Sequence, residues 1–290
     1  MKFRFIQQEQ RWYGVDVLCQ AMGVTRGGYW SWVRRRPGKR QQTDGVLLAD
    51  IMRIHGEKRR VYGSPRIHQH LKREGIHCGR KRVERLMREN GIRAKQARKF
   101  KPRTTDTDPN LPVAPNILNR QFVRQRPDEA WVGDMTCIAT DEGWLYLAAL
   151  MDLYSRRIVG WAMGDRIDRY LPLRALDMAA QRRRPPPGLL HHSDRGSQYA
   201  SADYQAALKG YGMVASMSRK GNCWDNAPME SWFHTMKTEL GQDQVYRSRR
   251  EAMAAVFEYM EVFYNGQRIH SGIGGLTPSE IEKLGPSRVA

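Results

Sequence analysis

The sequence has little of what marks a secreted or membrane-spanning protein. The longest apolar run, WLYLAALM at 144–151, is far shorter than the ~18 residues that a membrane helix needs. The segment MKFRFIQQEQ at 1–10 lacks the apolar stretch of a signal peptide. No CxxC pair occurs, which argues against a zinc knuckle or a disulfide framework built from Cys19, Cys78, Cys137 and Cys223. We therefore expect a soluble, cytoplasmic protein with reduced thiols.

Acidic residues are scarce in the first third of the chain. Residues 1–105 hold 27 lysines and arginines against 8 aspartates and glutamates, a net charge of +19, whereas residues 106–290 hold 22 of each. Such a local excess is typical of proteins that bind a polyanion, because each neutralised phosphate releases condensed counterions. A solvated basic face or a membrane-surface patch is the alternative. The confinement of the charge to one segment favours DNA.

The basic third contains two helical patterns. In VDVLCQAMGVTRGGYWSWVRRR at 15–36, a short helix, a turn and a second helix capped by Thr25 make a helix-turn-helix outline. After the linker PGKRQQTDG, a helix from about 44 to 57 precedes YGSPRIHQHLKREG, where we expect Ser64 to cap a helix that has Pro65 at its first position. The patterns predict two all-α DNA-binding units, residues 1–40 and residues 41–105.

The last helix of the second unit, within GRKRVERLMRENG at 79–91, has the pattern of a groove-reading helix. Its apolar positions form one stripe, and the rest of its surface is basic. The predicted DNA contacts of the two units are Arg80, Lys81, Arg82, Arg85, Arg34 and Arg35. An ordinary three-helix bundle with a basic surface is the alternative. We expect no zinc site, because no cysteine pair accompanies the nearby histidines at 68, 70 and 77.

The chain changes character after residue 105. Residues 106–126 are spaced by prolines and predict an extended linker. Three strand patterns and then alternating helices and strands follow, in the order β-β-β-α-β-α-β-α. We predict an α/β domain with a mixed five-stranded sheet over 127–245 and a helical tail over 246–290. A right-handed crossover would set the first strand beside the fourth, which brings Asp134 near Asp194.

A third acid joins these two. The helix in WDNAPMESWFHTMKTEL at 224–240 is expected to bring Glu230 to the same edge of the sheet. Adjacent carboxylates repel one another, and hard divalent cations such as Mg²⁺ are the usual resolution. Two such ions about 3.5 to 4 Å apart clamp the attacking and leaving oxygens of a phosphoryl displacement. Lys237, two helical turns after Glu230, is placed to hold a phosphate beside that site.

Polar residues near the acids have two interpretations each. Arg219 and Lys220, in the loop RKGNCWDN, are predicted to contact DNA, with a solvent loop as the alternative. His192 shares a strand face with the second acid and contacts DNA, supports that acid from behind, or is structural. We expect Asn226 to cap the catalytic helix, and Asp152 to cap the turn SRR rather than to bind metal.

Several of these motifs together resemble a known family. WVGDMT, HHSDRGSQY and DNAPMESWFHTMKTE, with 35 residues between Asp194 and Glu230, are similar to the acidic triad of the retroviral-integrase superfamily. With YGSPRI, RLMRENG, LYSRRIVGW and YNGQRIHSGIGGLTP they resemble the second reading frame of the IS-three family of bacterial insertion-sequence transposases, from about residue 12 to 283. Ser64 and Pro65 depart from the family pattern, as does the glycine-rich GIGGLTP.

The resemblance implies a ribonuclease H-like core and an enzyme that cuts and joins the ends of its own mobile element. Two Mg²⁺ ions, for which Mn²⁺ would substitute, would bind Asp134, Asp194 and Glu230. The implied partners are the terminal inverted repeats, the target duplex, other copies of the chain on that DNA and an upstream reading-frame product, all in the bacterial cytoplasm. A non-catalytic DNA-binding regulator and a ribonuclease H-like nuclease without joining activity are the alternatives.

Overall fold

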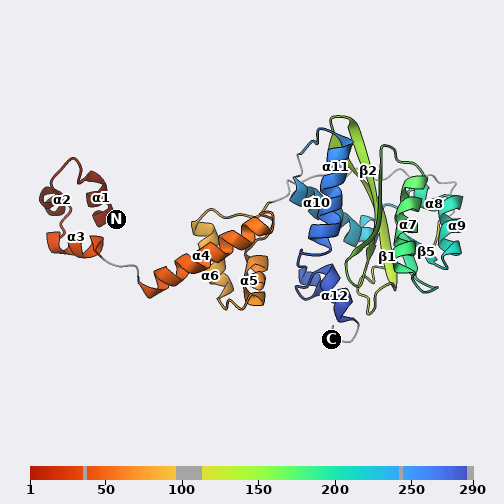
Figure 1. Ribbon diagram of the computed structural model, residues 1–290, viewed down its shortest axis with the longest axis horizontal. Coiled ribbons are helices and arrows are strands. Elements are labelled where there is room, and N and C mark those ends of the chain that lie inside the picture. Colours follow the sequence, from red (N-terminus) through yellow and green to blue (C-terminus); the bar gives the residue numbers. More distant parts are fainter. Residues whose placement is uncertain (35–37, 96–112, 242–243, 286–290) are drawn as a thin grey trace.

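The computed structural model describes residues 1–34, 38–95, 113–241 and 244–285. Figure 1 shows an elongated molecule, with a small helical unit at one end, a second helical unit in the middle and a sheet flanked by helices at the other end. The predicted DNA contact Arg35 and the first part of the predicted linker lie outside the described residues. No helix of the described ranges is long and apolar enough to cross a bilayer.

The first helical unit consists of α1 (Lys2–Glu9), α2 (Val15–Ala21) and α3 (Arg26–Val33). The sequence pattern predicts only the second and third of these helices. Thr25 caps α3 as predicted, because its hydroxyl accepts a hydrogen bond from the main-chain N–H of Gly28 at 3.1 Å. Ile6 of α1 is buried with Leu18 and Tyr29, so α1 completes the core of this small unit.

The second helical unit consists of α4 (Lys39–Glu57), α5 (Ser64–Arg73) and α6 (Arg80–Glu89). Each helix buries one apolar stripe, which includes Ile51, Ile67 and Val83. The predicted cap is wrong by one residue, because Gly63 occupies the N-cap position and Ser64 is already helical. Pro65 fits in the first turn, where its missing N–H removes no helical hydrogen bond.

A five-stranded mixed sheet forms the centre of the third part. Its strands are β1 (Ala130–Thr140), β2 (Gly143–Asp152), β3 (Ile158–Gly164), β4 (Leu190–Ser193) and β5 (Val214–Met217). They lie in the order β3-β2-β1-β4-β5. Strand β1 pairs antiparallel with β2 and parallel with β4, which confirms the predicted neighbourhood of the first and fourth strands.

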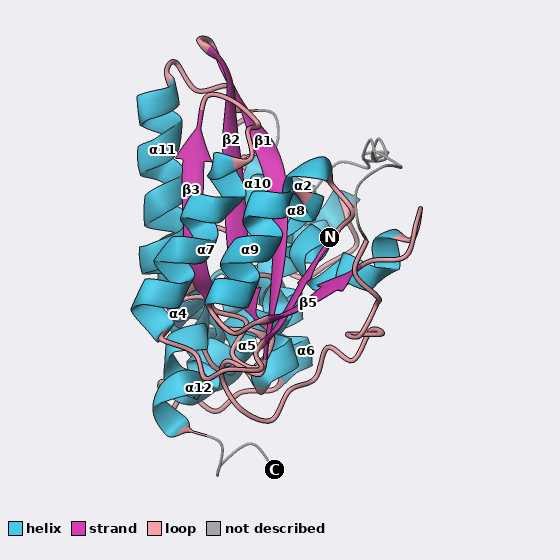
Figure 2. Ribbon diagram, turned by 90° about the vertical axis from the view of Figure 1, so that its right-hand side faces the viewer, coloured by secondary structure: helices cyan, strands magenta, loops and turns pink. Residues whose placement is uncertain are grey.

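Helices cover both faces of the sheet (Figures 1 and 2). One face carries α7 (Tyr170–Arg183), α8 (Ser197–Ala200) and α9 (Ala202–Gly210), and the other carries α10 (Ala227–Leu240) and α11 (Arg249–Phe257). Two hydrophobic cores lie on the two faces of the sheet, the first under α7, α8 and α9 and the second under α10 and α11. Side chains alternate along β1, so Trp131 is buried in the first core and Val132 in the second. The second core continues into the apolar stripe of the second helical unit.

The C-terminal segment packs against the sheet. After α11 it contains a π-helical stretch (Glu258–Tyr264), a short 3-10 turn (Ser271–Ile273) and α12 (Pro278–Leu284). The side chain of Asn265 exchanges two hydrogen bonds with the main chain of Ile158 on β3, at 3.0 and 3.1 Å. This pair holds the segment to the edge strand.

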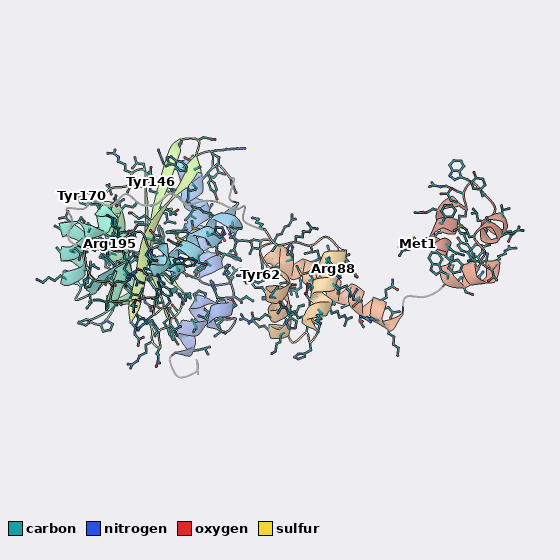
Figure 3. All side chains as sticks on the ribbon, turned by 180° about the vertical axis from the view of Figure 1, so that it is seen from behind. Met1, Tyr62, Arg88, Tyr146, Tyr170 and Arg195 are labelled. Carbon is teal, nitrogen blue, oxygen red and sulfur yellow. The ribbon has the colours of Figure 1, made fainter. Side chains whose placement is uncertain are left out.

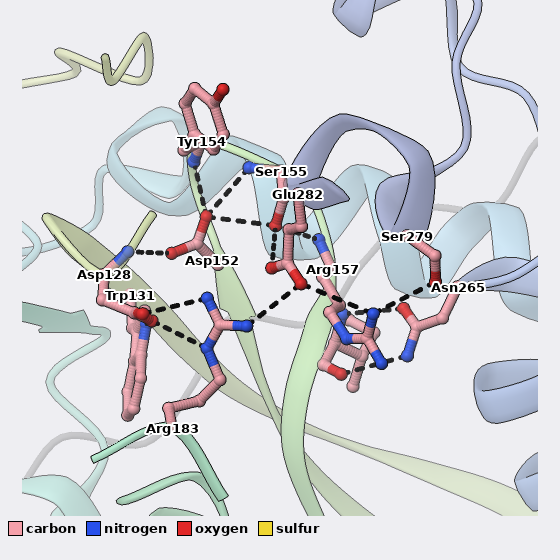
Figure 4. A network of polar contacts seen from close by, with 11 residues as sticks. Asp128, Trp131, Asp152, Tyr154, Ser155, Arg157, Arg183, Asn265, Ser279 and Glu282 are labelled. Atoms are coloured by element: carbon pink, nitrogen blue, oxygen red, sulfur yellow. Dashed lines mark hydrogen bonds and ion pairs between the residues drawn. The ribbon is translucent and has the colours of Figure 1, made fainter. Parts of the chain in front are cut away.

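A polar network ties the end of β2 to α12 (Figure 4). Asp152 accepts the main-chain N–H groups of Tyr154 and Ser155 at 2.9 and 2.8 Å, so it caps the turn as predicted. The Ser155 hydroxyl and the Arg183 guanidinium both donate to Glu282 of α12, at 2.9 and 3.0 Å. Burial raises the pKa of Asp152 to about 6.

The second helical unit touches this C-terminal segment. The Tyr62 hydroxyl donates to the main-chain carbonyl of Gln267 at 3.2 Å and accepts the N–H of Ile269 at 2.9 Å. Figure 3 places Tyr62 on the side of the unit that faces the sheet and Arg88 farther away. Arg59 also pairs with Glu258. The second helical unit and the part of the chain that contains the sheet are therefore packed together.

Candidate catalytic site

Asp134 lies within β1, opposite Ala149 of β2, on the face of the sheet that α10 covers. One of its carboxyl oxygens accepts the main-chain N–H of Met135 at 2.7 Å. Burial and the nearby charges of Asp194 and Glu230 raise the pKa of Asp134 well above its ordinary value. Lys237 acts in the opposite direction. The carboxyl of Asp134 is thus within electrostatic reach of the other two predicted acids and of the predicted lysine.

Asp194 directly follows β4, the parallel neighbour of β1. Its Oδ1 accepts the main-chain N–H of Gly196 at 2.9 Å. A Cβ atom at residue 196 would come within 3.0 Å of that same oxygen, so a larger residue would crowd the carboxylate. The glycine in HHSDRGSQY therefore lets the chain turn closely around the second acid.

Glu230 lies in the first turn of α10 and is exposed. The positive end of the helix dipole favours an anionic side chain at this place. Partial burial, followed by the charge of Asp194, raises the pKa of Glu230. Lys237 lies in the last turn of the same helix. The structure thus gathers the three acids from β1, from the end of β4 and from α10.

The donor set suits a hard divalent cation. All three side chains offer carboxyl oxygens, and the raised pKa values of Asp134 and Glu230 reflect burial first and then repulsion between the acids, both of which a bound cation would offset. Within the described ranges, no three histidine, cysteine, aspartate or glutamate side chains already form a cluster that could hold a metal ion. The acids are near enough to influence one another but are not drawn together as a ligand cluster.

Asn226 occupies the N-cap position of α10, as predicted, but its side chain makes no cap hydrogen bond. Its Nδ2 instead donates to the main-chain carbonyl of Gly133 on β1, at 3.1 Å. The predicted position at the helix N-terminus is therefore right, but the predicted capping hydrogen bond is not formed. The bond joins the start of the helix that carries Glu230 to the residue before Asp134.

His192 does not reach the surface. Its side chain is fully buried, and its ring nitrogens lie 2.9 Å from the Ser216 hydroxyl and 3.2 Å from the Ser218 hydroxyl. Burial lowers the pKa of His192 to about 4, so the ring is neutral at pH 7. The prediction of a DNA contact at His192 is wrong, and the structural alternative is right.

Asp225 organises the loop before α10, and the sequence analysis did not single it out. Its buried carboxylate accepts the main-chain N–H and the guanidinium of Arg219 at 2.7 to 2.9 Å, and the Nε of Arg120 at 2.8 Å. These partners, Arg219 first, hold the pKa of Asp225 below its usual range. Arg219 thus pairs within the protein while its side chain stays 48% exposed, and its DNA contact stays a prediction. Lys220 is exposed.

The basic face of the second unit is also partly engaged. The carboxylate of Asp44 accepts the Nε of Arg82 at 2.6 Å and an Nη of Arg85 at 2.7 Å. These two arginines brace α6 against α4, and their predicted DNA contacts stay predictions. Arg80 and Lys81 at the start of α6 are exposed, as is Arg34 in the first unit, and their DNA contacts stay predictions.

Three family models match the chain. An HTH-like domain matches residues 41–100, an integrase core domain matches residues 124–223, and a second integrase core domain matches residues 230–283. The first integrase core match ends at residue 223, in the loop before α10, and the second begins at residue 230, in the first turn of α10. The expected integrase-like core and the helix-turn-helix character of the middle unit are thereby confirmed.

Two solved structures resemble the chain weakly. One is a simian T-cell lymphotropic virus intasome in complex with PP2A regulatory subunit B56 gamma, with 13% identity, a TM-score of 0.47, and 80% of this chain and 74% of that chain covered. The other is the HTLV-2 integrase catalytic core domain in complex with magnesium, with 16% identity, a TM-score of 0.43, and coverage of 54% and 97%. The strand order and the family models establish the fold independently of these overlaps.

Curated relatives match over nearly the whole length. The chain is 47% identical over 266 residues to the insertion element IS600 uncharacterized 31 kDa protein of Shigella sonnei, which covers 92% of this chain and 97% of that protein. It is 42% identical over 288 residues to the transposase InsF for insertion sequence IS3A of Escherichia coli strain K12, with 97% and 98% covered. With this similarity and an integrase core, the chain belongs to the IS3 family of insertion-sequence transposases.

Proposed function

We propose that Asp134, Asp194 and Glu230 are the catalytic carboxylates of a DNA transposase. The observation that carries this proposal is the topology: β1 and β4 are parallel neighbours, so Asp134 on β1 and Asp194 directly after β4 come from adjacent strands, and α10, which carries Glu230, packs against β1. Burial, together with the charges of Asp194 and Glu230, raises the pKa of Asp134, which supports the same grouping. Membership of a transposase family supports the reaction class. The three acids also lie in the sequence motifs that resemble the acidic triad of the retroviral-integrase superfamily.

The reaction consists of two phosphoryl transfers. In the first, water attacks the phosphodiester at the element end, and the bond to the 3′ oxygen breaks and leaves a 3′-hydroxyl. In the second, that hydroxyl attacks a target phosphodiester, forms a new P–O bond and displaces the target's own 3′ oxygen. Bound at the triad, two Mg²⁺ ions, or Mn²⁺ in their place, would stabilise charge on the phosphoryl oxygens and make the attacking oxygen more acidic.

The chain itself contributes position and charge. Glu230 and Lys237 share one face of α10, so the lysine is placed to bind a phosphate next to the triad. The two helical units, residues 1–40 and 41–105, would bind the terminal inverted repeats through Arg80, Lys81 and Arg34. Lys220, in the loop before α10, would contact the same DNA. Assembly of several copies on that DNA, or with an upstream reading-frame product, is part of the proposal.

The decisive experiment removes one acid at a time. Asp134→Asn, Asp194→Asn and Glu230→Gln should each lower cleavage and joining of element-end DNA in Mg²⁺ by about 10³-fold or more, because several kcal/mol of charge stabilisation are lost. DNA affinity should stay within a few-fold of wild type. Asp165→Asn, at an exposed acid on the loop after β3, is the matched control and should retain full activity. Wild-type cleavage by any of the three variants would remove that residue from the site.

A joining assay separates the transposase from a plain nuclease. A pre-cleaved end with a free 3′-hydroxyl should be joined to target DNA by the wild-type protein. Cleavage without any joining would favour the ribonuclease H-like nuclease, and DNA binding without cleavage would favour the regulator.

A further inference from the structure

A basic cavity lies where the second helical unit meets the catalytic part. It has a volume of about 260 Å³ and is lined from four segments that are far apart in the chain. Arg66 comes from α5, Arg156 from the turn after β2, Trp232 from α10, and Arg268 and His270 from the C-terminal segment. The described residues that line it do not include any of the three catalytic acids, so it is a separate site.

Positive charge in this cavity exceeds negative charge. Arg268 pairs with Glu239 at 2.8 Å, with both side chains at most 6% exposed. Arg66 lies 3.7 Å from the same carboxylate. Arg156 donates to the main-chain carbonyl of Phe122 at 3.0 Å. In the described part of the chain, Glu239 is the one carboxylate paired with these three guanidinium groups, which leaves two charges uncompensated.

Burial of these arginines makes their excess positive charge unfavourable. Burial lowers the pKa of Arg66, and the neighbouring Arg268 lowers it further. Burial also lowers the pKa of Arg156, and burial together with the three arginines lowers the pKa of His270 well below its ordinary value. Grouped cations that are partly removed from water are stabilised by a bound anion.

One residue of the cavity lining carries an unsatisfied hydrogen-bond donor. Trp232 is 3% exposed, and its indole Nε1 has no hydrogen-bond partner among the described residues. An indole N–H can only donate, and a buried donor without a partner costs about 1 to 3 kcal/mol. Ser231 and Thr235 line the cavity from the same helix and add two hydroxyl groups. The lining thus offers many donors and two unmatched positive charges.

We propose that the cavity binds a backbone phosphate of the element DNA, held between Arg66 of the helical unit and Arg156 and Arg268 of the catalytic part. Guanidinium groups match the oxygens of a phosphate with paired hydrogen bonds. Since a water molecule takes up about 30 Å³ of liquid, a cavity of about 260 Å³ has room for a phosphate group and several waters. Anion binding stands on the cavity alone, whereas the choice of DNA rests on the function proposed above.

The location explains what such a contact would achieve. Ser231 directly follows Glu230 on α10, so the cavity lies around the helix from the triad, within about one helix diameter of 10 to 12 Å. A strand that enters the catalytic site passes close to it. A phosphate bound there would connect the DNA, the DNA-binding unit and the catalytic part, and would fix the strand a short distance from the reacting phosphate.

The test uses the full chain with Arg66→Gln and Arg156→Gln, and with Arg166→Gln as the matched control. Arg166 is 80% exposed on the loop after β3 and does not line the cavity. Thermal unfolding is followed with inorganic phosphate against chloride at equal ionic strength. Phosphate should raise the Tm of the wild type and of the control, and should raise it clearly less in the two cavity variants.

The second measurement is the salt dependence of binding to element-end duplex. Loss of one phosphate contact should reduce the slope of log K against log salt by about 0.9 in each cavity variant, and not in the control. An equal Tm gain from phosphate in all four proteins would overturn the anion site. If the cavity variants lose the Tm gain from phosphate but keep the wild-type slope of log K against log salt, the site binds free phosphate. That result would overturn the DNA contact.

These outcomes remain separable from the catalytic proposal. A wild-type protein that shows the phosphate effect but neither cleaves nor joins DNA would contradict the proposed function and leave the anion site intact. Arg66 is on a helix with its side chain 32% exposed, so Arg66→Gln preserves the test should Arg156→Gln fail to fold.

Discussion

The side-chain amide of Asn226 donates a hydrogen bond to the main-chain carbonyl of Gly133, at 3.1 Å and across 93 residues of sequence. Gly133 precedes Asp134 on β1, and Asn226 stands at the start of the helix that carries Glu230. The bond therefore sets the position of the third acid against the first. The buried Oδ1 of Asn226 has no hydrogen-bond partner within the described ranges. The amide therefore acts here through its donor atom, Nδ2, which bonds Gly133.

Replacing this positioning residue should weaken catalysis without weakening DNA binding. Asn226→Ala should lower the cleavage rate at saturating DNA by about tenfold to a hundredfold, because small misplacements of reacting groups cost that much. The Mg²⁺ concentration for half-maximal rate should rise. Asn226→Asp should fail in the same way, since a carboxylate cannot donate. An unaltered rate and Mg²⁺ requirement in both variants would show that the Asn226 bond does not position α10.

The Asp225 ion pairs predict a dependence of stability on pH. A folded-state pKa below the unfolded value means that the stabilisation is complete above about pH 4 and is lost as the pH falls from there toward the folded-state pKa. At pH 7, Asp225→Asn should unfold about 1 to 2 kcal/mol more easily, a value kept small because Arg120 and Arg219 are 43% and 48% exposed. The difference in the free energy of unfolding between the wild type and Asp225→Asn, measured with urea, should be smaller at pH 3 than at pH 7. A difference of constant size would contradict the assigned pKa.

Close packing of β3 on α7 predicts opposite effects at two glycines. A Cβ at Gly160 would lie 2.3 Å from the main-chain oxygen of Ala175, whereas a Cβ at Gly45 in α4 would meet nothing within 4 Å. Gly160→Ala should therefore destabilise the protein by about 1 to 3 kcal/mol, and Gly45→Ala should stabilise it by about 0.4 to 1 kcal/mol. Thermal unfolding should give a lower Tm than the wild type for Gly160→Ala and a higher Tm for Gly45→Ala. Equal shifts would mean that the β3–α7 contact relaxes freely.

The strand order and the acids could be predicted because local patterns fix them. Alternation marks β1, the turn DEGW separates β1 from β2, and the crossover rule places Asp194 beside β1. The resemblance to a known family then identified the fold and the reaction. Helix α1 was missed because its 8 residues bury a single side chain, Ile6, which gives no period to read.

The partners of charged residues could not be predicted in the same way. Arg82 is predicted as a DNA contact from the pattern of its own helix, which does not show the ion pair that it makes with Asp44, 38 residues earlier. His192 has the right strand face, yet Ser216 and Ser218 enclose it. A sequence shows on which side of an element a residue points, whereas its ion pairs depend on which distant segment packs there.

Lys237 provides the sharpest test of how α10 serves the site. Seven residues are close to two helical turns, so its ammonium group lies on the face that carries Glu230. Its charge lowers the pKa of Asp134, so the ammonium group is within electrostatic reach of the first acid. We predict that it binds a phosphate of the terminal DNA and does not ligate metal, since an ammonium group offers donors and no lone pair.

Lys237→Ala should therefore lower cleavage and joining at correct element ends by about tenfold or more, as expected when a charge-assisted contact worth ~1.5 to 3 kcal/mol is lost. The Mg²⁺ affinity should change little. Lys209→Ala, at an exposed lysine in α9, is the matched control and should behave as wild type. The assay compares correct with scrambled end sequences at several Mg²⁺ concentrations. A defect that extra Mg²⁺ cures would assign the lysine to support of the metal site, and activity equal to that of the control would show that Lys237 is an ordinary surface residue.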